Sequence, residues 1–380
     1  MLNRQDRFEQ TKGRLEPRRI AVFFLTPQGE ALSGRLLSDE AGEQFNLTRS
    51  TTLEIKKLAE LPAVFERYDG LIMIMAMGIV VRKIAPLLRG KEIDPAVVVL
   101  DQKARFAISL LSGHLGGANE LAREVCAVLG RSCVPIITTA TDLEEVTAFD
   151  LFAKETGSKI ANIAALPTVS GDLVAGRPVG FVSDLEVERD FSEMVIRLDR
   201  GQPPPDRIHS YVVFSTRTDL LECSNEDQPT KPSQDLNSNA ALRIYPRILF
   251  VGIGCKQGVE ASYLSDCLDH LLEEIGESPL SIAAVATIDL KGKEPALLTL
   301  CQERGIPLIT YTARELNRAI TSAQALGIDF GESTFVRQTV GVPSVSGPAA
   351  WLASEKGDLL VDKRRFSGVT ISISRERRLF

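Results

Sequence analysis

A glycine-rich run at residues 110–119, Leu-Leu-Ser-Gly-His-Leu-Gly-Gly-Ala-Asn, sets a histidine between an apolar segment that predicts a strand and an amphipathic segment that predicts a helix. An imidazole titrates near neutral pH, so His114 is a candidate general acid or base. Gly113, Gly116 and Gly117 let the backbone approach a ligand closely, and the start of the helix offers amide donors to an anion. A turn histidine bonded to the backbone is the competing interpretation, and it stays open.

Polar residues near this run offer further chemistry. Ser112 stands two residues before the histidine, but no GxSxG elbow surrounds it, so a turn or capping role is favoured over a nucleophile. The run from Thr138 to Asp142 ends another predicted strand. Asp142 is a second catalytic candidate, and Thr138 and Thr139 are candidate ligands of the substrate. A capping turn is the slightly favoured alternative there.

Basic residues stand at two places that suit a polyanion. Arg82 and Lys83 follow a glycine at the end of a predicted strand, and Arg105 closes a hairpin-length connection at residues 101–104. Most charges of this kind are solvated surface. Because ligands of open α/β sheets bind beyond strand ends, we expect Arg82 and Lys83 to overhang the sheet edge that carries His114.

A second glycine-rich run, Gly-Ile-Gly-Cys-Lys-Gln-Gly at residues 252–258, also follows a predicted strand and opens a helix. Its third glycine comes one residue late for a dinucleotide fingerprint, and Asp289 is only a tempting candidate for the ribose-binding acid. NAD binding is therefore disfavoured. We expect instead a generic anion site, with Gly254 in the turn and Lys256 as its charge partner.

The bulk composition excludes several classes of function. The 380 residues carry a net charge of −6, so no global basic field argues for nucleic-acid binding. The three histidines form no HExxH motif, so no protein-bound metal is expected. The longest apolar stretch, residues 71–81, is too short for a bilayer, which needs about 20 residues. The six cysteines form no CxxC pair and no cleavable signal peptide precedes them, which predicts reduced thiols in the cytoplasm.

The chain is longer than one hydrophobic core, and its alternating strand and helix patterns predict an α/β protein of several domains. We expect N-terminal and C-terminal three-layer α/β/α domains with mixed, largely parallel sheets, joined by a small middle domain. Residues 223–242 have almost no bulky apolar content, which predicts a linker. The predicted divisions are a mobile arm at 1–18, an N-terminal domain at 19–142, a middle domain at 143–222, the linker at 223–242 and a C-terminal domain at 243–380.

Two sets of motifs resemble the cobalt-precorrin-5A hydrolase family of the anaerobic branch of cobalamin (vitamin B12) biosynthesis. The set that is similar to the family's N-terminal domain comprises residues 77–88, 94–99, 109–119 and 138–142. The set that is similar to its C-terminal domain comprises residues 252–258, 286–289 and 344–350. The resemblance covers nearly everything after residue 18, and its N-terminal motif is long and specific.

The resemblance implies a hydrolase that opens the δ-lactone of a cobalt corrinoid and releases acetaldehyde, giving cobalt-precorrin-5B. It implies a small-molecule corrinoid partner. No cofactor is expected beyond the cobalt of that substrate, because its conjugated macrocycle can accept the electron pair of the carbon–carbon bond that breaks. A non-catalytic tetrapyrrole carrier of the same pathway is the alternative, and a homodimer stays open. No catalytic residue is carried over from the family, so the roles follow from residue chemistry.

We therefore expect His114 to activate water, while the amides of Gly116 and Gly117 stabilise the oxyanion. Asp142 is the second catalytic candidate, and basic residues are expected to hold the acetate and propionate arms of the corrinoid. The predicted substrate ligands are Arg82, Lys83, Arg105, Ser112, Gly113, Gly116, Gly117, Asn119, Thr138, Thr139, Gly254 and Lys256.

Overall fold

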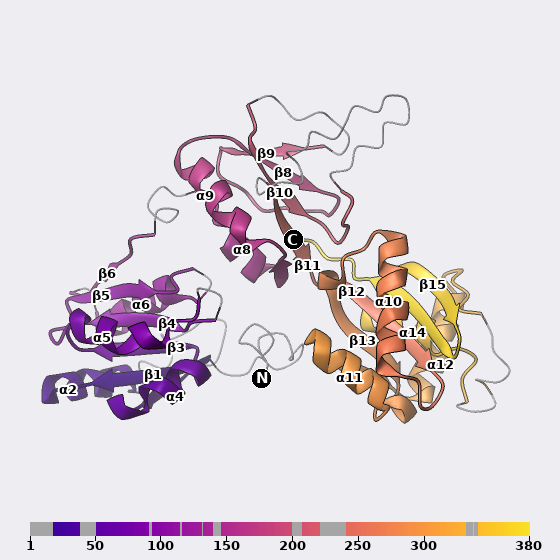
Figure 1. The fold of residues 1–380 in the computed structure, drawn as a ribbon, viewed down its shortest axis with the longest axis horizontal. Helices are drawn as coiled ribbons and strands as arrows, with labels where there is room; N and C mark the ends of the chain where they lie inside the picture. The colour runs from indigo at the N-terminus through magenta and orange to yellow at the C-terminus, as the bar shows by residue number, and fades with distance from the viewer. Residues whose placement is uncertain are drawn as a thin grey trace. The chain divides into compact units, whose positions relative to one another are not determined.

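The fold divides into two compact units, Met1–Leu151 and Phe152–Phe380, and three sheets run through them (Figure 1). The predicted class, an α/β protein of several domains with mixed, largely parallel sheets, is confirmed. Among the described residues, no helix has the length and apolar character needed to cross a membrane. The computed structural model describes residues 18–38, 51–90, 93–114, 116–130, 132–139, 146–199, 207–220, 241–331, 337 and 341–380.

The first sheet has the strand order β2-β1-β3-β4-β5-β6 and lies in the first unit. Four of its strands are parallel, and β5 then runs antiparallel to β4 and parallel to β6. The reversal occurs at a tight turn in which the Asp101 carboxylate accepts hydrogen bonds from backbone amides, including that of Phe106. The predicted hairpin at residues 101–104 is therefore confirmed. The strands are β1 (Arg18–Phe24), β2 (Thr51–Ile55), β3 (Gly70–Ile74), β4 (Ala96–Leu100), β5 (Phe106–Leu111) and β6 (Val134–Ile136).

Helices cover both faces of this sheet because its central strands are apolar on both sides. Every residue of β3 is buried, and alternate residues point to opposite faces. Ile72 packs against α2 and α6, whereas Leu71 packs against α4 and α5. The helical segments on the two faces of this sheet are α2 (Pro27–Leu36), η1 (Leu58–Glu60), α4 (Leu61–Arg67), α5 (Met77–Ile84), η2 (Ala85–Leu87) and α6 (Ala118–Leu129).

The second sheet has the order β7-β11-β10-β8-β9, and an aromatic cluster fills its core. The ring of Phe152 meets that of Phe214 edge-on, with centroids 4.9 Å apart, and Phe181 lies beside both. Its elements are α8 (Phe149–Glu155), β7 (Ser158–Ile160), η3 (Ile163–Ala165), α9 (Leu166–Val174), β8 (Val179–Ser183), β9 (Val195–Leu198), β10 (Ser210–Phe214) and β11 (Ala241–Pro246).

Strand β11 corrects the predicted end of the linker and the start of the C-terminal domain. Ala241 and Leu242, placed in the linker, pair with β10, and the chain stays in the second sheet through Pro246. The reason is local: Ala241 begins an apolar pattern that is buried against the sheet, although a polar run precedes it in the sequence. The second sheet therefore continues through residue 246, past the predicted domain boundary at 243.

The third sheet has the order β14-β13-β12-β16-β15, in which three parallel strands are followed by an antiparallel hairpin. Val251 of β12 packs against α10 and α11, and its neighbour Phe250 packs against α12 and α14. A three-layer arrangement results. The elements are β12 (Leu249–Cys255), α10 (Ala261–Ile275), η4 (Pro279–Ser281), β13 (Ile282–Ile288), η5 (Asp289–Lys291), α11 (Pro295–Arg304), β14 (Leu308–Tyr311), α12 (Ala313–Gln324), α14 (Ser346–Ala353), β15 (Asp358–Phe366) and β16 (Val369–Arg375).

A charged cluster around Glu54 of β2 predicts how the first sheet responds to acid. Hydrogen bonds from Lys56 and Tyr68 lower the pKa of Glu54 to about 2, from an ordinary value of 4.5. A depressed carboxyl pKa stabilises the fold above about pH 4.5, and this contribution is lost as the pH falls toward about 2. Replacing Glu54 with Gln should therefore flatten the pH dependence of the free energy of unfolding in this window. Urea titrations of both proteins across the window test this, and parallel curves would contradict it.

Candidate functional site

The glycine-rich run forms a compact turn between the end of β5 and the start of α6. Ser112 and Gly117 both adopt left-handed backbone, with φ of 56° and 84°. The Ala118 amide donates to the Ser112 carbonyl at 3.1 Å, and the Asn119 amide donates to the Gly113 carbonyl at 3.1 Å. The first amides of α6 are thus bonded to the turn that precedes the helix.

These bonds correct the predicted oxyanion site. The Gly117 amide donates to the carbonyl of His114 at 3.0 Å, so it does not serve as an oxyanion donor in this conformation. The Gly116 amide has no acceptor among the described residues, so it is the donor that remains of the predicted pair. An amide at a helix start binds an anion only where the protein has not already used it.

Packing explains two of the glycines in the turn. A Cβ atom on Gly113 would lie 2.9 Å from Oδ1 of Asn119, and one on Gly116 would lie 2.3 Å from Cβ of Ser112. Both positions need glycine because the turn folds tightly onto itself. The packing of the turn is therefore enough to explain these two glycines, without a bound ligand.

Asn119 ties three elements together beneath the turn. It is buried, its Oδ1 accepts a hydrogen bond from Ser109 of β5 at 2.7 Å, and its Nδ2 donates to Oγ1 of Thr139 at 3.1 Å. Thr139 follows β6, which runs parallel to β5, so both strands end at the same edge of the sheet. The structure thus brings Thr139 to the His114 turn, as the sequence predicts. The neighbouring Thr138 is exposed.

Ser112 lies in the turn, one of the two roles that the sequence analysis favoured over a nucleophile, whereas the residue that caps α6 is Gly117. The Ser112 hydroxyl donates to the backbone carbonyl of Asp94 at 3.1 Å, and thereby joins the turn to the loop that leads into β4. The Asp94 carboxylate in turn accepts hydrogen bonds from the amides of Arg89 and Gly90. These bonds hold the amino edge of β4 against the end of β5.

An acidic residue that the sequence analysis missed faces the histidine. Nδ1 of His114 lies 3.5 Å from Oδ2 of Asp150, and only 12% and 14% of the two side chains are exposed. A carboxylate beside one ring nitrogen fixes the orientation and tautomer of the imidazole, which suits the other nitrogen for proton transfer. Asp150 lies in the first turn of α8, where acidic residues are common, so no local motif in the sequence singles it out. Asp142, the predicted second catalytic residue, lies outside the described residues.

Arg105 does not join this cluster. It precedes β5 whereas His114 follows it, so the two residues lie at opposite edges of the sheet, with about 20 Å of strand between them. The Arg105 side chain is 60% exposed, and its Nε lies 3.6 Å from Oδ1 of Asp101. The structure therefore does not bring Arg105 to the His114 turn, because the two residues lie at opposite ends of β5.

Arg82 and Lys83 lie on the opposite side of the sheet from α6. They are in the last turn of α5, whose buried residues Val80 and Ile84 pack on the face that carries Phe23. Nη1 of Arg82 donates to the carbonyl of Gly78 at 3.1 Å. No contact among the described residues joins either side chain to the His114 turn.

The second glycine-rich run lies in the second unit and already holds a carboxylate of this chain. The Gly258 amide donates to Oε1 of Glu294 at 3.0 Å, and Nζ of Lys291 donates to its Oε2 at 2.7 Å. Both bonds lower the pKa of Glu294 below its ordinary value, and the bond from Lys291 has the larger effect. Glu294 is buried, so it occupies the anion position that the sequence predicts for a ligand.

The two predicted ligands in this run have other surroundings. The Lys256 amide donates to the carbonyl of Gly368 at 2.9 Å and extends the pairing of β12 with β16, while its side chain is exposed. Gly254 is near the end of β12. A Cβ atom added to it would lie 3.8 Å from Cβ of Val345. Among the described residues, no group of three or more His, Cys, Asp or Glu side chains is placed to hold a metal ion.

Family models match three successive parts of the chain. They are described as Cobalamin synthesis G N-terminal at residues 60–142, Cobalamin biosynthesis central region at 147–235 and Cobalamin synthesis G C-terminus at 249–374. The His114 turn falls in the first match, Asp150 in the second and the 252–258 run in the third. All three parts of the chain are therefore similar to cobalamin-synthesis proteins.

Curated relatives belong to the same family. The chain is 36% identical to the cobalt-precorrin-5A hydrolase of Salmonella typhimurium, over 94% of this chain and 98% of that protein. It is 34% identical to the enzyme of the same name from Priestia megaterium, over 83% and 80%. A putative cobalamin biosynthesis protein G homolog from Sulfolobus solfataricus is 19% identical over 94% of this chain and 97% of that one, with a TM-score of 0.38.

Proposed function

The chain belongs to the cobalt-precorrin-5A hydrolase family, and from this premise we propose that it opens the δ-lactone of cobalt-precorrin-5A and releases acetaldehyde to give cobalt-precorrin-5B. The observation that carries the proposal is the 36% identity to the Salmonella enzyme across 98% of its length. The family matches in all three parts of the chain support it. We place the reaction in the cytoplasm, within cobalamin biosynthesis.

His114 is proposed as the base of the first step. It takes a proton from a water molecule as the oxygen of that water attacks the lactone carbonyl, and the Gly116 amide donates to the oxygen that becomes negative. The tetrahedral intermediate then collapses and the lactone C–O bond breaks, which leaves a carboxylic acid and an alkoxide on the substrate. Asp150, 3.5 Å from the imidazole, stabilises the protonated ring during this step.

The second step breaks a carbon–carbon bond of the substrate. The alkoxide forms the carbonyl of acetaldehyde, and the electron pair of the broken bond passes into the conjugated corrinoid before a proton replaces the lost carbon. We expect no cofactor beyond the cobalt that the substrate carries, because this macrocycle accepts the electron pair. In this proposal His114, protonated in the first step, returns that proton.

Acetate and propionate arms give the substrate several negative charges. With Arg105 at the other edge of the sheet, Arg82 and Lys83 remain the proposed partners of these arms on the first unit. Charge-assisted hydrogen bonds to guanidinium and ammonium groups are the strongest that such carboxylates form. Their removal should weaken binding more than it slows the chemistry.

Anaerobic incubation of the purified protein with cobalt-precorrin-5A tests the proposed reaction directly. Trapped acetaldehyde, formed in proportion to the corrinoid consumed, is the expected result. A carrier would bind the corrinoid and return it unchanged. Recovery of intact cobalt-precorrin-5A bound to the protein, with no aldehyde, would therefore replace the hydrolase proposal with the carrier alternative.

Asp150 offers a further test of the proposed base. Replacing Asp150 with Asn keeps the size of the side chain but removes the charge beside His114, so kcat should fall by about tenfold to a hundredfold with little change in KM. Steady-state acetaldehyde release measures both. Glu120→Gln is the matched control, since Glu120 is an exposed acid in the first turn of α6. Equal kcat values for the two variants would remove Asp150 from the mechanism.

A further inference from the structure

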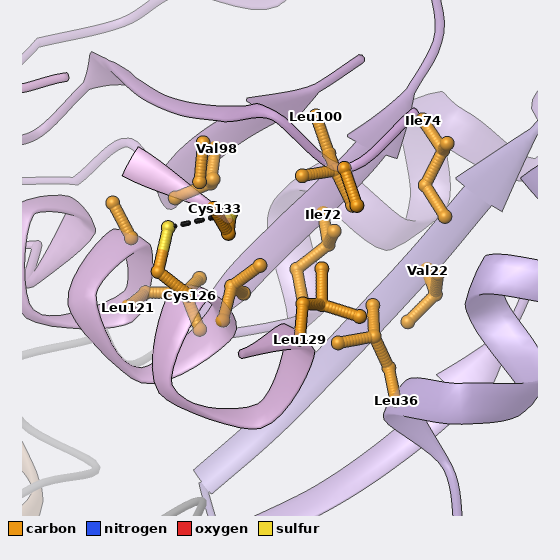
Figure 2. Close-up of a cluster of buried hydrophobic side chains, with 14 of the residues drawn as sticks. Val22, Leu36, Ile72, Ile74, Val98, Leu100, Leu121, Cys126, Leu129 and Cys133 are labelled. Carbon is orange, nitrogen blue, oxygen red and sulfur yellow. Dashed lines mark hydrogen bonds between the residues drawn. The ribbon is translucent and has the colours of Figure 1, made fainter. Parts of the chain in front are cut away.

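Two cysteines meet in the core between α6 and the first sheet. Cys126 is in the last turn of α6 and Cys133 directly precedes β6. Each is 7% exposed, and their Sγ atoms lie 2.6 Å apart (Figure 2). Unbonded carbon atoms pack best at about 3.5–4.0 Å, and sulfur is larger, so this is an unusually close approach for two thiols.

The fold brings the two sulfur atoms together through a tight reversal of the chain. Gly130 ends α6 with φ of 95°, and the Cys133 amide donates to its carbonyl at 3.0 Å. Leu121 and Val98 belong to the same apolar cluster around the pair, as Figure 2 shows. Burial raises the pKa of both thiols, that of Cys133 to about 12, so both are protonated at neutral pH.

We propose that Cys126 and Cys133 are a site of reversible oxidation, at which a thiol disulfide such as oxidised glutathione converts the pair to an intrachain disulfide. One thiol loses its proton and attacks a sulfur of the oxidant, which forms a mixed disulfide and expels one thiolate. The second cysteine then attacks the mixed disulfide and expels the other thiolate. The protein loses two electrons and two protons, and the oxidant becomes two thiols.

The disulfide would join α6 and the start of β6, the two elements whose other ends lie next to the His114 turn. Helix α6 provides Asn119 and β6 leads to Thr139, and these residues are already hydrogen-bonded at one end of the two elements. A bond between Cys126 and Cys133 would fix the other end. Because it closes a short loop, oxidation should raise the melting temperature of this unit by roughly 5 °C.

Peptide mapping of the full chain tests the proposal. The protein is incubated with oxidised glutathione, quenched in acid, unfolded, alkylated and digested with trypsin, which cleaves at Arg123, Arg131 and Lys154. The expected product is peptide 124–131 linked to peptide 132–154, lighter than the two reduced peptides together by two hydrogen atoms. Dithiothreitol should separate the two peptides and lower the melting temperature again.

Cys301 provides the internal control in the same digest. It is equally buried, at 7% exposed, but no hydrogen bond joins its sulfur to another cysteine of the described residues, so it should be recovered alkylated. Recovery of Cys126 and Cys133 as alkylated thiols or as stable glutathione adducts would overturn the proposal. Linkage of either residue to a different cysteine would do the same. None of these readouts requires turnover of a corrinoid, so a failure here leaves the proposed reaction untouched.

Discussion

Replacing His114 with Ala is expected to lower the rate of acetaldehyde release by about 10²–10⁴-fold, the usual contribution of a general base. Two features of the structure support this proposed role. The turn from Ser112 to Gly117 is held by backbone hydrogen bonds, and Asp150 faces the ring at Nδ1. Water alone is a poor nucleophile toward a lactone, so loss of the base should appear in kcat rather than in KM.

Two controls separate loss of the base from loss of the fold. His270→Ala removes an exposed histidine on α10, in the other unit, and should leave the rate unchanged. The His114 variant should keep the wild-type circular dichroism spectrum and bind the corrinoid with similar affinity. A folded His114→Ala protein that releases acetaldehyde at the wild-type rate would show that this residue only shapes the turn.

The strands and their layers follow from local sequence patterns. Segments such as Leu71–Ile74 are apolar at every position, which is typical of strands buried on both faces, and the helices between them show one apolar side. These properties depend on residues that are neighbours in sequence. The three-layer arrangement of the first and third sheets was therefore predictable.

The candidate site was less predictable because it depends on strand direction. The hairpin at residues 101–104 was recognised, but its consequence is that β5 ends at the edge of the sheet where β4 begins. Arg105, which precedes β5, therefore lies at the opposite edge from His114, which follows it. Asp150 shows the complementary difficulty, since it is distant from His114 in the sequence and no local pattern links it to the imidazole.

Glycine-rich runs were the most ambiguous signals in the sequence. A run that follows a strand and opens a helix suits a bound anion, yet the amide of Gly258 binds the chain's own Glu294. In the first run, added Cβ atoms at Gly113 and Gly116 would meet Asn119 and Ser112. Spacing in the sequence does not distinguish a glycine that admits a ligand from one that admits another part of the chain.

Gly252 and Gly254 turn this distinction into an experiment. A Cβ on Gly252 would lie 1.9 Å from the carbonyl oxygen of Ser346 and 2.8 Å from the amide nitrogen of Ala350, both backbone atoms of α14. The helix cannot keep its position on β12 against such an overlap. Gly252→Ala should therefore lower the free energy of unfolding of this unit by about 3 kcal/mol, at the upper end of the usual cost of overpacking.

Gly254→Ala is the matched control, because it adds the same methyl group two residues along the same strand. Its nearest neighbour outside the adjacent residues would be Cβ of Val345 at 3.8 Å, an ordinary contact, so the expected change in stability is small. Trp351, the single tryptophan of the chain, is buried in α14 and reports the unfolding of this helix by its fluorescence during urea titration. Equal midpoints for the two variants would mean that α14 yields to the added methyl group. A lower midpoint for Gly252→Ala alone would show that the first glycine of the run serves the packing of α14 on β12.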